Sequence, residues 1–455
     1  MALRVWQRSA QKVTGIGPTG VRQGLPPGPG LNPLRQWAFL QRPRPEHIRL
    51  RRRYGDVVMI HGSDGPLVMA MTAAGAREVL TADPSWYGAT QKRSLTNLTG
   101  AGALWVLEGE RHRRERQLLT PAFHLQAIRD HGYFIQAAAR RHTDAWQPGQ
   151  ELRIFDVMVA LTRDTILRVL SGLERGPLLD QGRQIMSDVL RTVCPTVSFI
   201  PELQHWWYPR WRQYARAKEA FGQFLRACVA ERRASGAELH DVLGLLLAAR
   251  YDGDPIPDDE ISAELGTLAF TGHVTTATAL SWSIYELGRH PAVLARLREE
   301  VDALPPDAAP EVVARQSYLS AVCDESQRLH TMLPEIGRRM LETHDLLGYT
   351  LPAGISVGVG IGAIHHDPEI YPEPDRFRPV RFVERTFSPY EFLPFGGSHR
   401  RCIGAALSDF EARVALAEIV RRWDLEIIGE DEEVRKSIIT GPKHGVRARV
   451  VGPRR

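Results

Sequence analysis

One stretch near the middle of the chain constrains the fold more than any other. Residues Asp259–Arg289 predict a single helix, because Asp258 or Asp259 can cap it and no proline follows within 31 residues. At 1.5 Å per residue such a helix spans roughly 46 Å. Its centre, LGTLAFTGHVTTATALSWSIYEL, is apolar on nearly every side, so the helix must be buried. A large and mainly helical domain is needed to surround it.

The rest of the 455 residues agrees with that expectation. Apolar residues three and four positions apart predict helices over most of 109–250, over 292–303 and 317–329, and from Cys402 to about Trp423. Strand patterns are fewer and lie at 56–72, with a turn at Ser63–Gly65, at 344–365, and at 424–430 and 445–452. We therefore expect a mainly α fold with a smaller β part, built as a single large domain over residues 25–455.

Composition excludes several classes of protein. The net charge of +5 is too small by itself to indicate nucleic-acid binding. Residues 1–24 lack the ~20 apolar residues of a membrane span and are too polar for a signal peptide, so we expect a flexible basic segment and no membrane anchor. The four cysteines are scattered, which excludes a zinc ribbon or a disulfide framework and fits a cytoplasmic protein.

The segment FGGSHRRCIG, residues 395–404, places Cys402 among glycines and basic residues, directly before an apolar helix. Free N–H groups and the partial positive charge at a helix N-terminus stabilise a thiolate. Glycines permit tight turns and the close approach of a flat ligand. For a lone cysteine the alternative is a buried and inert thiol.

This segment resembles the haem-binding loop of the cytochrome P-450 superfamily. The matching residues are Phe395, Gly396, Arg400, Cys402 and Gly404. The resemblance implies a haem b whose iron is bound by the Cys402 thiolate. Ser398 departs from the pattern, because the family usually has glycine there.

A second motif of the family is a Glu-x-x-Arg pair, here Glu325 and Arg328, joined by an arginine from a downstream segment. Alone, such a pair is most often a solvated surface pair. Two downstream segments resemble each other, PDRF with Arg376 and PVRF with Arg381, and the family's usual arrangement favours Arg381. The resemblance implies that this trio is a structural lock and not a catalyst.

The long helix resembles the central helix of the family, with Gly272, His273, Thr275 and Thr276 as candidate catalytic positions. The resemblance implies that Gly272 lets the helix pass close to the haem and that Thr275 hydrogen-bonds oxygen or water. Val274 replaces the acid that helps to deliver protons in the family. Three interpretations stay open: His273 titrates near neutral pH, His273 faces away, or water carries the protons. Thr275 itself can instead bond back to its own helix.

A fourth motif, GERHRRERQLLTPAF, places His112 and Arg116 four residues apart on one helix face. The resemblance implies that both residues, together with Arg338 and Arg400, bind the haem propionates, and the guanidinium fork suits carboxylates. The alternative is a solvated basic helix.

Four motifs in the family's order imply a monooxygenase, an oxidoreductase that hydroxylates an apolar small molecule and takes electrons from a ferredoxin and its reductase. Two rivals are a haem-thiolate peroxygenase or peroxide isomerase, which Val274 motivates, and a haem-binding sensor. Aromatic and aliphatic residues in segments 85–105 and 193–211 suggest a substrate such as a fatty acid, terpenoid or polyketide.

Basic residues near the haem motifs raise a further question about the electron donor. They form a docking patch for an acidic ferredoxin, or else they pair internally with Glu108, Glu110 and Glu115 or bind the propionates and leave no net patch. The basic residues concerned are Arg111, Arg113, Arg114, His399, Arg400 and Arg401.

Overall fold

The computed structural model describes residues 22, 24–30, 33–62, 65–236, 241–251 and 253–454. The predicted N-terminal segment 1–24 lies almost wholly outside the described residues, as do Ser63 and Asp64 of the predicted turn. The chain forms two compact units. The sheet unit comprises residues up to 93, 333–376 and 387–401, and the helical unit comprises 94–332, 377–386 and 402–455. The fold is mainly helical with small sheets, as predicted.

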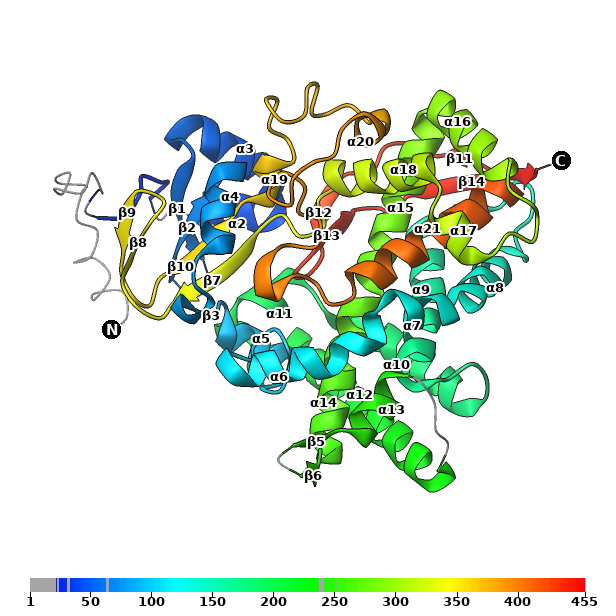
Figure 1. The fold of residues 1–455 in the computed structure, drawn as a ribbon, viewed down its shortest axis with the longest axis horizontal. Helices are drawn as coiled ribbons and strands as arrows, with labels where there is room; N and C mark the ends of the chain where they lie inside the picture. Colours follow the sequence, from blue (N-terminus) through cyan, green and yellow to red (C-terminus); the bar gives the residue numbers. More distant parts are fainter. Residues whose placement is uncertain are drawn as a thin grey trace. The chain divides into compact units, whose positions relative to one another are not determined.

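The sheet unit contains a five-stranded sheet in the order β1-β2-β10-β7-β3. The predicted hairpin is confirmed, because β1 (Val57–Gly62) pairs antiparallel with β2 (Gly65–Ala70). Strand β10 (Ser356–Val359) runs parallel to β2 and antiparallel to β7 (Ile336–Met340), whose other neighbour is β3 (Tyr87–Ala89). In Figure 1 the yellow strands β10 and β7 therefore lie beside blue strands from a part of the chain far away in sequence. The sheet gives Arg338, on β7, a fixed position.

Short helices and a second strand pair complete the sheet unit. Val68, Val357 and other side chains of the sheet are fully buried against apolar residues of these elements. The elements are α2 (Pro33–Gln41), α3 (Pro43–Tyr54), α4 (Ala73–Thr81), β8 (His344–Leu346), β9 (Tyr349–Leu351) and α19 (Ile361–Ile364). The predicted strand pattern over 344–365 was thus right for three strands, while its last residues form a helical turn.

The helical unit holds the long helices. Two large apolar clusters form its core, one around α9, α12 and α14 and one around α15, α18 and α21. Its helices are α5 (Lys92–Thr99), α6 (Gly109–Leu119), α7 (Leu125–Asp130), α8 (Gly132–Thr143), α9 (Ile154–Ser171), α10 (Pro177–Thr192), α11 (Pro195–Phe199), α12 (Pro209–Ser235), α13 (Val242–Ala248), α14 (Asp258–Gly272), α15 (Val274–Arg289), α16 (Pro291–Asp302), α17 (Pro310–Ala314), α18 (Ser317–Leu329), α20 (Val380–Glu384) and α21 (Ala405–Arg422).

Short strands accompany these helices. Strands β11 (Trp423–Ile427), β14 (Arg447–Pro453) and β4 (Glu151–Arg153) form one sheet. The two predicted C-terminal strands correspond to β11 and β14. The remaining pairs are β5 (Arg250–Tyr251) with β6 (Asp254–Pro255) and β12 (Glu433–Arg435) with β13 (Thr440–Pro442). Within the described residues, every helix is too short or too polar to cross a membrane.

The prediction of one unbroken helix over Asp259–Arg289 was wrong. The segment forms α14 and α15, which meet at His273, where the backbone has φ −107° and ψ −45°. Glycine at 272 weakens the helix locally, and the Thr162 hydroxyl of α9 donates a hydrogen bond of 2.9 Å to the His273 carbonyl oxygen. The predicted cap was also wrong, because Pro257 precedes the helix and Asp258 and Asp259 lie in its first turn.

Candidate functional site

Exposure separates Cys402 from the other three cysteines. Cys228 and Cys323 are buried, and burial raises the pKa of each thiol to about 12, which makes them inert. Cys194 is half-buried beside the Thr196 hydroxyl. Cys402 is exposed and precedes α21 by three residues. A Cβ at Gly404 would lie 4.0 Å from the Cys402 sulfur, so the glycine leaves the space beside the thiol open.

The turn before Cys402 uses backbone conformations that favour glycine. Gly396 has φ +65°, and a Cβ at Gly397 would lie 2.9 Å from the Leu80 side chain. Ser398 has φ +63°, a left-handed conformation that is uncommon for a residue with a side chain. The departure that the sequence shows at Ser398 therefore falls on a position where glycine would fit without strain. The Arg401 guanidinium lies 5.9 Å from the Phe395 ring centre, within reach of a cation–π contact.

Two arginines predicted to bind propionates come together in the sheet unit. Arg338 lies on β7, and Arg400 belongs to a single 3₁₀ turn, Ser398–Arg400. Burial, and next the positive charge of Arg400, lower the pKa of Arg338 to about 10. Both residues are half-buried, and two like charges that interact there repel each other and favour an anion near them.

Helix α6 in the helical unit carries His112 and Arg116. His112 is buried and Arg116 is half-buried, while the neighbouring Arg113 and Arg114 are exposed. The four-residue spacing places His112 and Arg116 on the same, inward face of α6. The motif is thus not a wholly solvated basic helix.

The buried trio matches the predicted lock. Glu325 Oε2 accepts from Arg328 Nε at 2.7 Å, and Glu325 Oε1 accepts from Arg381 Nε at 2.9 Å. The Arg378 backbone N–H also donates to Glu325 Oε1, at 2.8 Å. The side chains of Glu325 and Arg328 are fully buried, and Arg381 is 6% exposed. Arg376, from the similar earlier segment, lies outside the trio and forms an exposed pair with Glu373.

Gly272 and His273 lie at the junction of α14 and α15. A Cβ at Gly272 would lie 2.7 Å from Ile166, so this glycine is needed for the packing of α9. The His273 ring is buried, and its Nδ1–H donates to the Ala269 carbonyl oxygen at 2.8 Å. Burial lowers the pKa of His273 to about 4, although the bond to Ala269 acts in the opposite direction. The ring is neutral at pH 7, which contradicts the interpretation that it titrates near neutrality.

The two threonines after the junction differ in their surroundings. Thr275 is half-buried, and its hydroxyl donates to the Thr271 carbonyl oxygen at 2.9 Å, the back-bonded arrangement that was one of the alternatives. Thr276 is buried, and its hydroxyl donates to Ser408 Oγ of α21 at 3.0 Å. Thr276 therefore joins two helices, while Thr275 lies on a partly accessible face together with Thr271 and Val274.

Sequence reasoning missed two buried acids in the helical unit. Glu264 of α14 and Glu411 of α21 are 4% and 2% exposed, and one carboxyl oxygen of each has no hydrogen-bond partner. Burial raises the pKa of each to about 8. The signal for Glu264 was available, because it is the one charged residue in the apolar run from Ile261 to Gly272.

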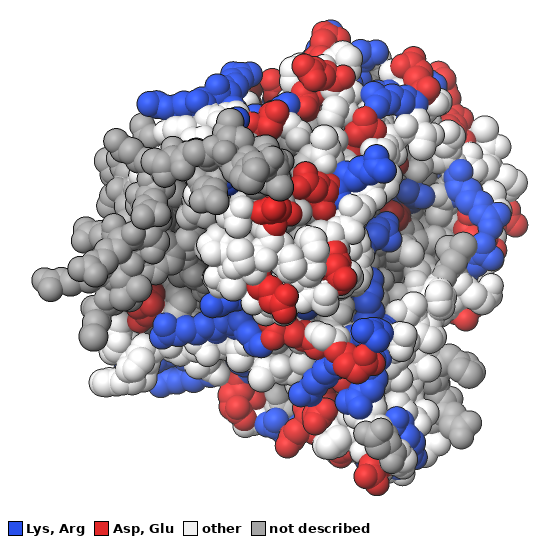
Figure 2. Space-filling model, turned by 60° about the vertical axis from the view of Figure 1, so that its left-hand side comes forward, with Lys and Arg blue, Asp and Glu red and all other residues white. Residues whose placement is uncertain are grey.

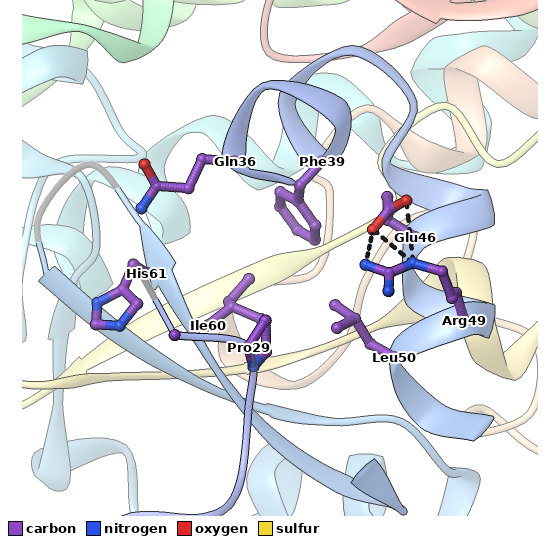
Figure 3. Close-up of a pocket in the computed structure, with 9 residues that line it drawn as sticks. Pro29, Gln36, Phe39, Glu46, Arg49, Leu50, Ile60 and His61 are labelled. Carbon is purple, nitrogen blue, oxygen red and sulfur yellow. Dashed lines mark hydrogen bonds and ion pairs between the residues drawn. The ribbon is translucent and has the colours of Figure 1, made fainter. Parts of the chain in front are cut away.

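Two cavities lie away from the residues discussed so far. One in the sheet unit, of about 30 Å³, is lined by Phe39, Leu50 and Ile60 and closed on one side by the Glu46–Arg49 pair (Figure 3). It has room for little more than water. The other, in the helical unit, has a volume of about 300 Å³ and is lined by Arg129, Glu311, Ala314, Arg315, Ala406, Asp409, Phe410 and Arg413.

These residues fit the haem that the resemblance implies. A lone exposed thiol before a helix N-terminus is a soft ligand suited to iron, and it needs no second cysteine. The Arg338–Arg400 pair offers the positive charge that two propionate groups require. Cys402 belongs to the helical unit, and Arg338 and Arg400 belong to the sheet unit.

The comparisons with known proteins agree with the motifs. The sequence profile of the family described as Cytochrome P450 matches residues 26–444. A putative cytochrome P450 135B1 of Mycobacterium tuberculosis is 34% identical over 439 residues, which cover 94% of this chain and 91% of that protein. A putative cytochrome P450 138 of the same organism is 33% identical over 413 residues, covering 88% and 90%.

Solved structures share the fold. A retinoic acid-bound cyanobacterial CYP120A1 superposes with a TM-score of 0.83 at 23% identity and covers 94% of this chain and 99% of that chain. The haem domain of a cytochrome P450DA superposes with a TM-score of 0.81 at 24% identity, covering 96% and 98%.

Proposed function

This chain belongs to the cytochrome P450 family, an oxidoreductase family with a haem-thiolate cofactor, and from that premise we propose that it inserts one oxygen atom of O₂ into an apolar small molecule. The observation that carries this proposal is the exposed Cys402 at the end of its loop, since the two buried thiols are inert and the fourth is half-buried. Cys402 would then hold the haem iron through its thiolate. When bound, a haem with this ligand activates dioxygen, because the thiolate pushes electron density toward the iron.

The first test concerns the ligand. Cys402→Ser should abolish the red-shifted carbon monoxide band of the ferrous haem protein, because the thiolate donor is lost. Cys194→Ser is the matched control and should keep the band. Retention of the band by Cys402→Ser would make another cysteine the ligand and overturn the assignment.

Other residues of the chain have supporting roles in the proposal. Arg338 and Arg400 would neutralise the haem propionates, and His112 and Arg116 of α6 would bind them as well. Thr275 lies on the partly accessible face of α15, where its hydroxyl could turn from the Thr271 carbonyl toward a dioxygen or water molecule. Thr276, bonded to Ser408, fixes the helix on α21.

An apolar substrate is supported by the residues beside α14. Trp105, from the first predicted substrate segment, meets the Phe270 ring edge-on with 6.3 Å between ring centres. Phe270 directly precedes Thr271 and is partly exposed. In the second predicted segment, Trp206 and Trp207 are exposed. A panel of fatty acids, terpenoids and polyketides tested by Soret shift would identify the class.

A ferredoxin and its reductase are the proposed electron donors. Of the basic residues considered for docking, Arg113 pairs with Glu110 at 2.8 Å, Arg111 pairs with Glu260 at 3.4 Å, and Arg114 covers the Tyr251 ring. These contacts support internal pairing of the α6 arginines, with Glu110 of the same helix and with residues of α14 and β5. Figure 2 shows basic and acidic side chains interspersed on one face of the molecule. Arg401 is exposed, so Arg401→Glu should slow the first electron transfer from an acidic ferredoxin and leave the substrate-induced Soret shift intact.

A peroxygenase or peroxide isomerase is the second candidate, and one observation favours it. Val274 carries no proton and the neutral His273 does not titrate near pH 7, so the usual proton donor is lacking at this place on the helix. Consumption of peroxide without a reductase, combined with no product from O₂ and the reductase, would establish this alternative.

The cytoplasmic location stays a prediction.

A further inference from the structure

Glu264 of α14 has no role in the haem motifs, yet its environment is unusual. The side chain is 4% exposed, and Oε1 has no hydrogen-bond partner. An ionised carboxylate in such a place would lose most of its solvation without compensation. The geometry therefore favours the neutral carboxylic acid, which carries a proton.

The groups around Glu264 act in the same direction. Glu115 of α6 is also buried, and its Oε2 accepts a hydrogen bond from the Tyr251 hydroxyl of β5. Burial, and next the charge of Glu115, raise the pKa of Glu264 to about 8, while Arg111 opposes the shift. Arg111 in turn pairs with Glu260, and both side chains are about half exposed. The acid thus lies behind a charged and solvent-accessible pair.

A line of threonine hydroxyls leads from Glu264 to the junction of α14 and α15. Thr267 Oγ1 donates to the Ala263 carbonyl oxygen at 3.0 Å, and Thr271 Oγ1 donates to the Thr267 carbonyl oxygen at 2.9 Å. Thr275 Oγ1 donates to the Thr271 carbonyl oxygen at 2.9 Å, so the line continues across the break at His273. Residues three, seven and eleven positions after Glu264 lie on the same side of a helix.

We propose that Glu264 supplies protons to Thr275 along the hydroxyls of Thr267 and Thr271. It would thereby take the role of the acid that the family has where this chain has Val274. The proposal rests on the monooxygenase function. In each transfer Glu264 gives its proton to the line, every hydroxyl accepts one proton and releases one, and Thr275 passes one proton on. Glu264 then takes a proton from solvent on the side of Arg111 and Glu115, so the line returns to its starting state.

The spacing suits transfer through short bridges of water. Eleven residues at 1.5 Å span roughly 16 Å, and successive threonines four residues apart are roughly 6 Å apart along the axis. Two waters in series bridge two oxygens at about that separation, since each hydrogen bond covers close to 3 Å and the angle at each water shortens the path. Thr271 and Thr275 are half-buried, and each hydroxyl keeps acceptor lone pairs while it donates to its carbonyl.

The first experiment measures the proton on Glu264 without turnover. In the haem-loaded protein the infrared band of protonated carboxyl groups should shrink in Glu264→Gln, and the part that is lost should titrate near pH 8. The remaining band is expected from Glu411 and from Asp324, whose pKa burial raises to about 7. Glu299→Gln, an exposed acid of α16, is the control and should leave the band unchanged. If Glu264→Gln also leaves the band unchanged, Glu264 carries no proton and the proposal is overturned.

The second experiment measures whether turnover uses the proton of Glu264. With O₂, a ferredoxin and its reductase, Glu264→Gln and Thr271→Val should each slow product formation by about 100-fold, the lower end of general acid catalysis, and divert electrons to hydrogen peroxide. The double variant should be no slower than either single one, since both interrupt one line. Hydrogen peroxide brings its own protons, so peroxide-driven turnover should persist.

Thr278→Val is the matched control, because Thr278 is back-bonded to Val274 in the same way but faces Gly441. Its reductase-driven rate should equal that of the wild type. If the wild type forms product with the reductase and Glu264→Gln forms it equally fast, the proton line is overturned while the monooxygenase function stands. If the wild type forms no product with the reductase, both are overturned.

Discussion

Two buried polar regions of the helical unit differ in how their charges are satisfied. In the lock, Glu325 accepts hydrogen bonds from two arginine side chains and from the Arg378 backbone N–H. On α14, Glu264 has a carboxyl oxygen with no partner. Buried charges persist where every atom is paired, whereas a buried acid without a partner keeps its proton. The first arrangement holds the fold together, and the second stores a proton.

The lock should show the largest effect when it is broken. Glu325→Gln removes the negative charge and leaves Arg328 and Arg381 buried without compensation. Such a loss typically costs about 4 kcal/mol of the free energy of unfolding. This is a large part of the free energy of unfolding of an ordinary domain, so little folded protein should be recovered. Urea unfolding followed by circular dichroism checks the result.

The matched control for the lock is Glu373→Gln, which breaks the exposed pair with Arg376. Solvent screens such a pair, so its unfolding midpoint should match that of the wild type. Equal losses in Glu325→Gln and Glu373→Gln would remove the distinction between the two arginine segments.

The unpaired acid should show a smaller effect that depends on pH. The folded-state pKa of Glu264, about 8, lies above its usual value of 4.5. Between these values the unfolded chain releases a proton that the folded chain retains, so the stability of the wild type falls as pH rises from about 4.5 to about 8. Glu264→Gln should remove this fall, which amounts to a few kcal/mol because one pKa unit corresponds to about 1.4 kcal/mol.

Unfolding of the two proteins at pH 5 and pH 8 measures this difference. Glu264→Gln should gain stability relative to the wild type at pH 8. Glu411→Gln should show the same direction, since the pKa of Glu411 is also raised to about 8 by burial. A difference between variant and wild type that does not change with pH would mean that Glu264 is ionised in the folded protein.

The half-buried arginines of the sheet unit, Arg338 and Arg400, offer a third case. Arg338 has a pKa lowered to about 10, chiefly by burial and then by Arg400, so its charge destabilises the haem-free protein. Arg338→Met should therefore raise the free energy of unfolding of the haem-free protein by about 1–2 kcal/mol and weaken haem binding. Arg339→Met, an exposed neighbour on β7, should change neither quantity. A loss of haem-free stability in Arg338→Met would show that Arg338 is paired internally.

The smallest effect is expected at Ser398. Its φ of +63° is strained for serine, so Ser398→Gly should stabilise the protein by less than about 1 kcal/mol. Ser398→Ala keeps a Cβ and should show no gain. Thermal unfolding at one pH distinguishes them, and an equal response of both variants would exclude backbone strain as the cause.

Much of the fold could be predicted because periodicity and turn signals are local. The hairpin of β1 and β2, helices α16, α18 and α21, and the two C-terminal strands all follow from spacing in the sequence. The break at His273 was missed although Gly272 is a local signal, and the contact of Thr162 on α9 with the His273 carbonyl, 111 residues away in sequence, could not be predicted. The lock could be located because its motif is specific, but its full burial is a property of packing.

By itself the sequence determined the family, the mainly helical class and the residues that carry the motifs, Cys402 and Glu325 among them, because these depend on residue identity and spacing. Tertiary structure alone decided which side chains keep their protons. His273 is neutral and Glu264 is protonated because burial removes the solvation of their charged forms. The same sequence pattern would allow either group to titrate normally at a surface, so only the packing of α6, α9 and α14 around them settles their chemistry.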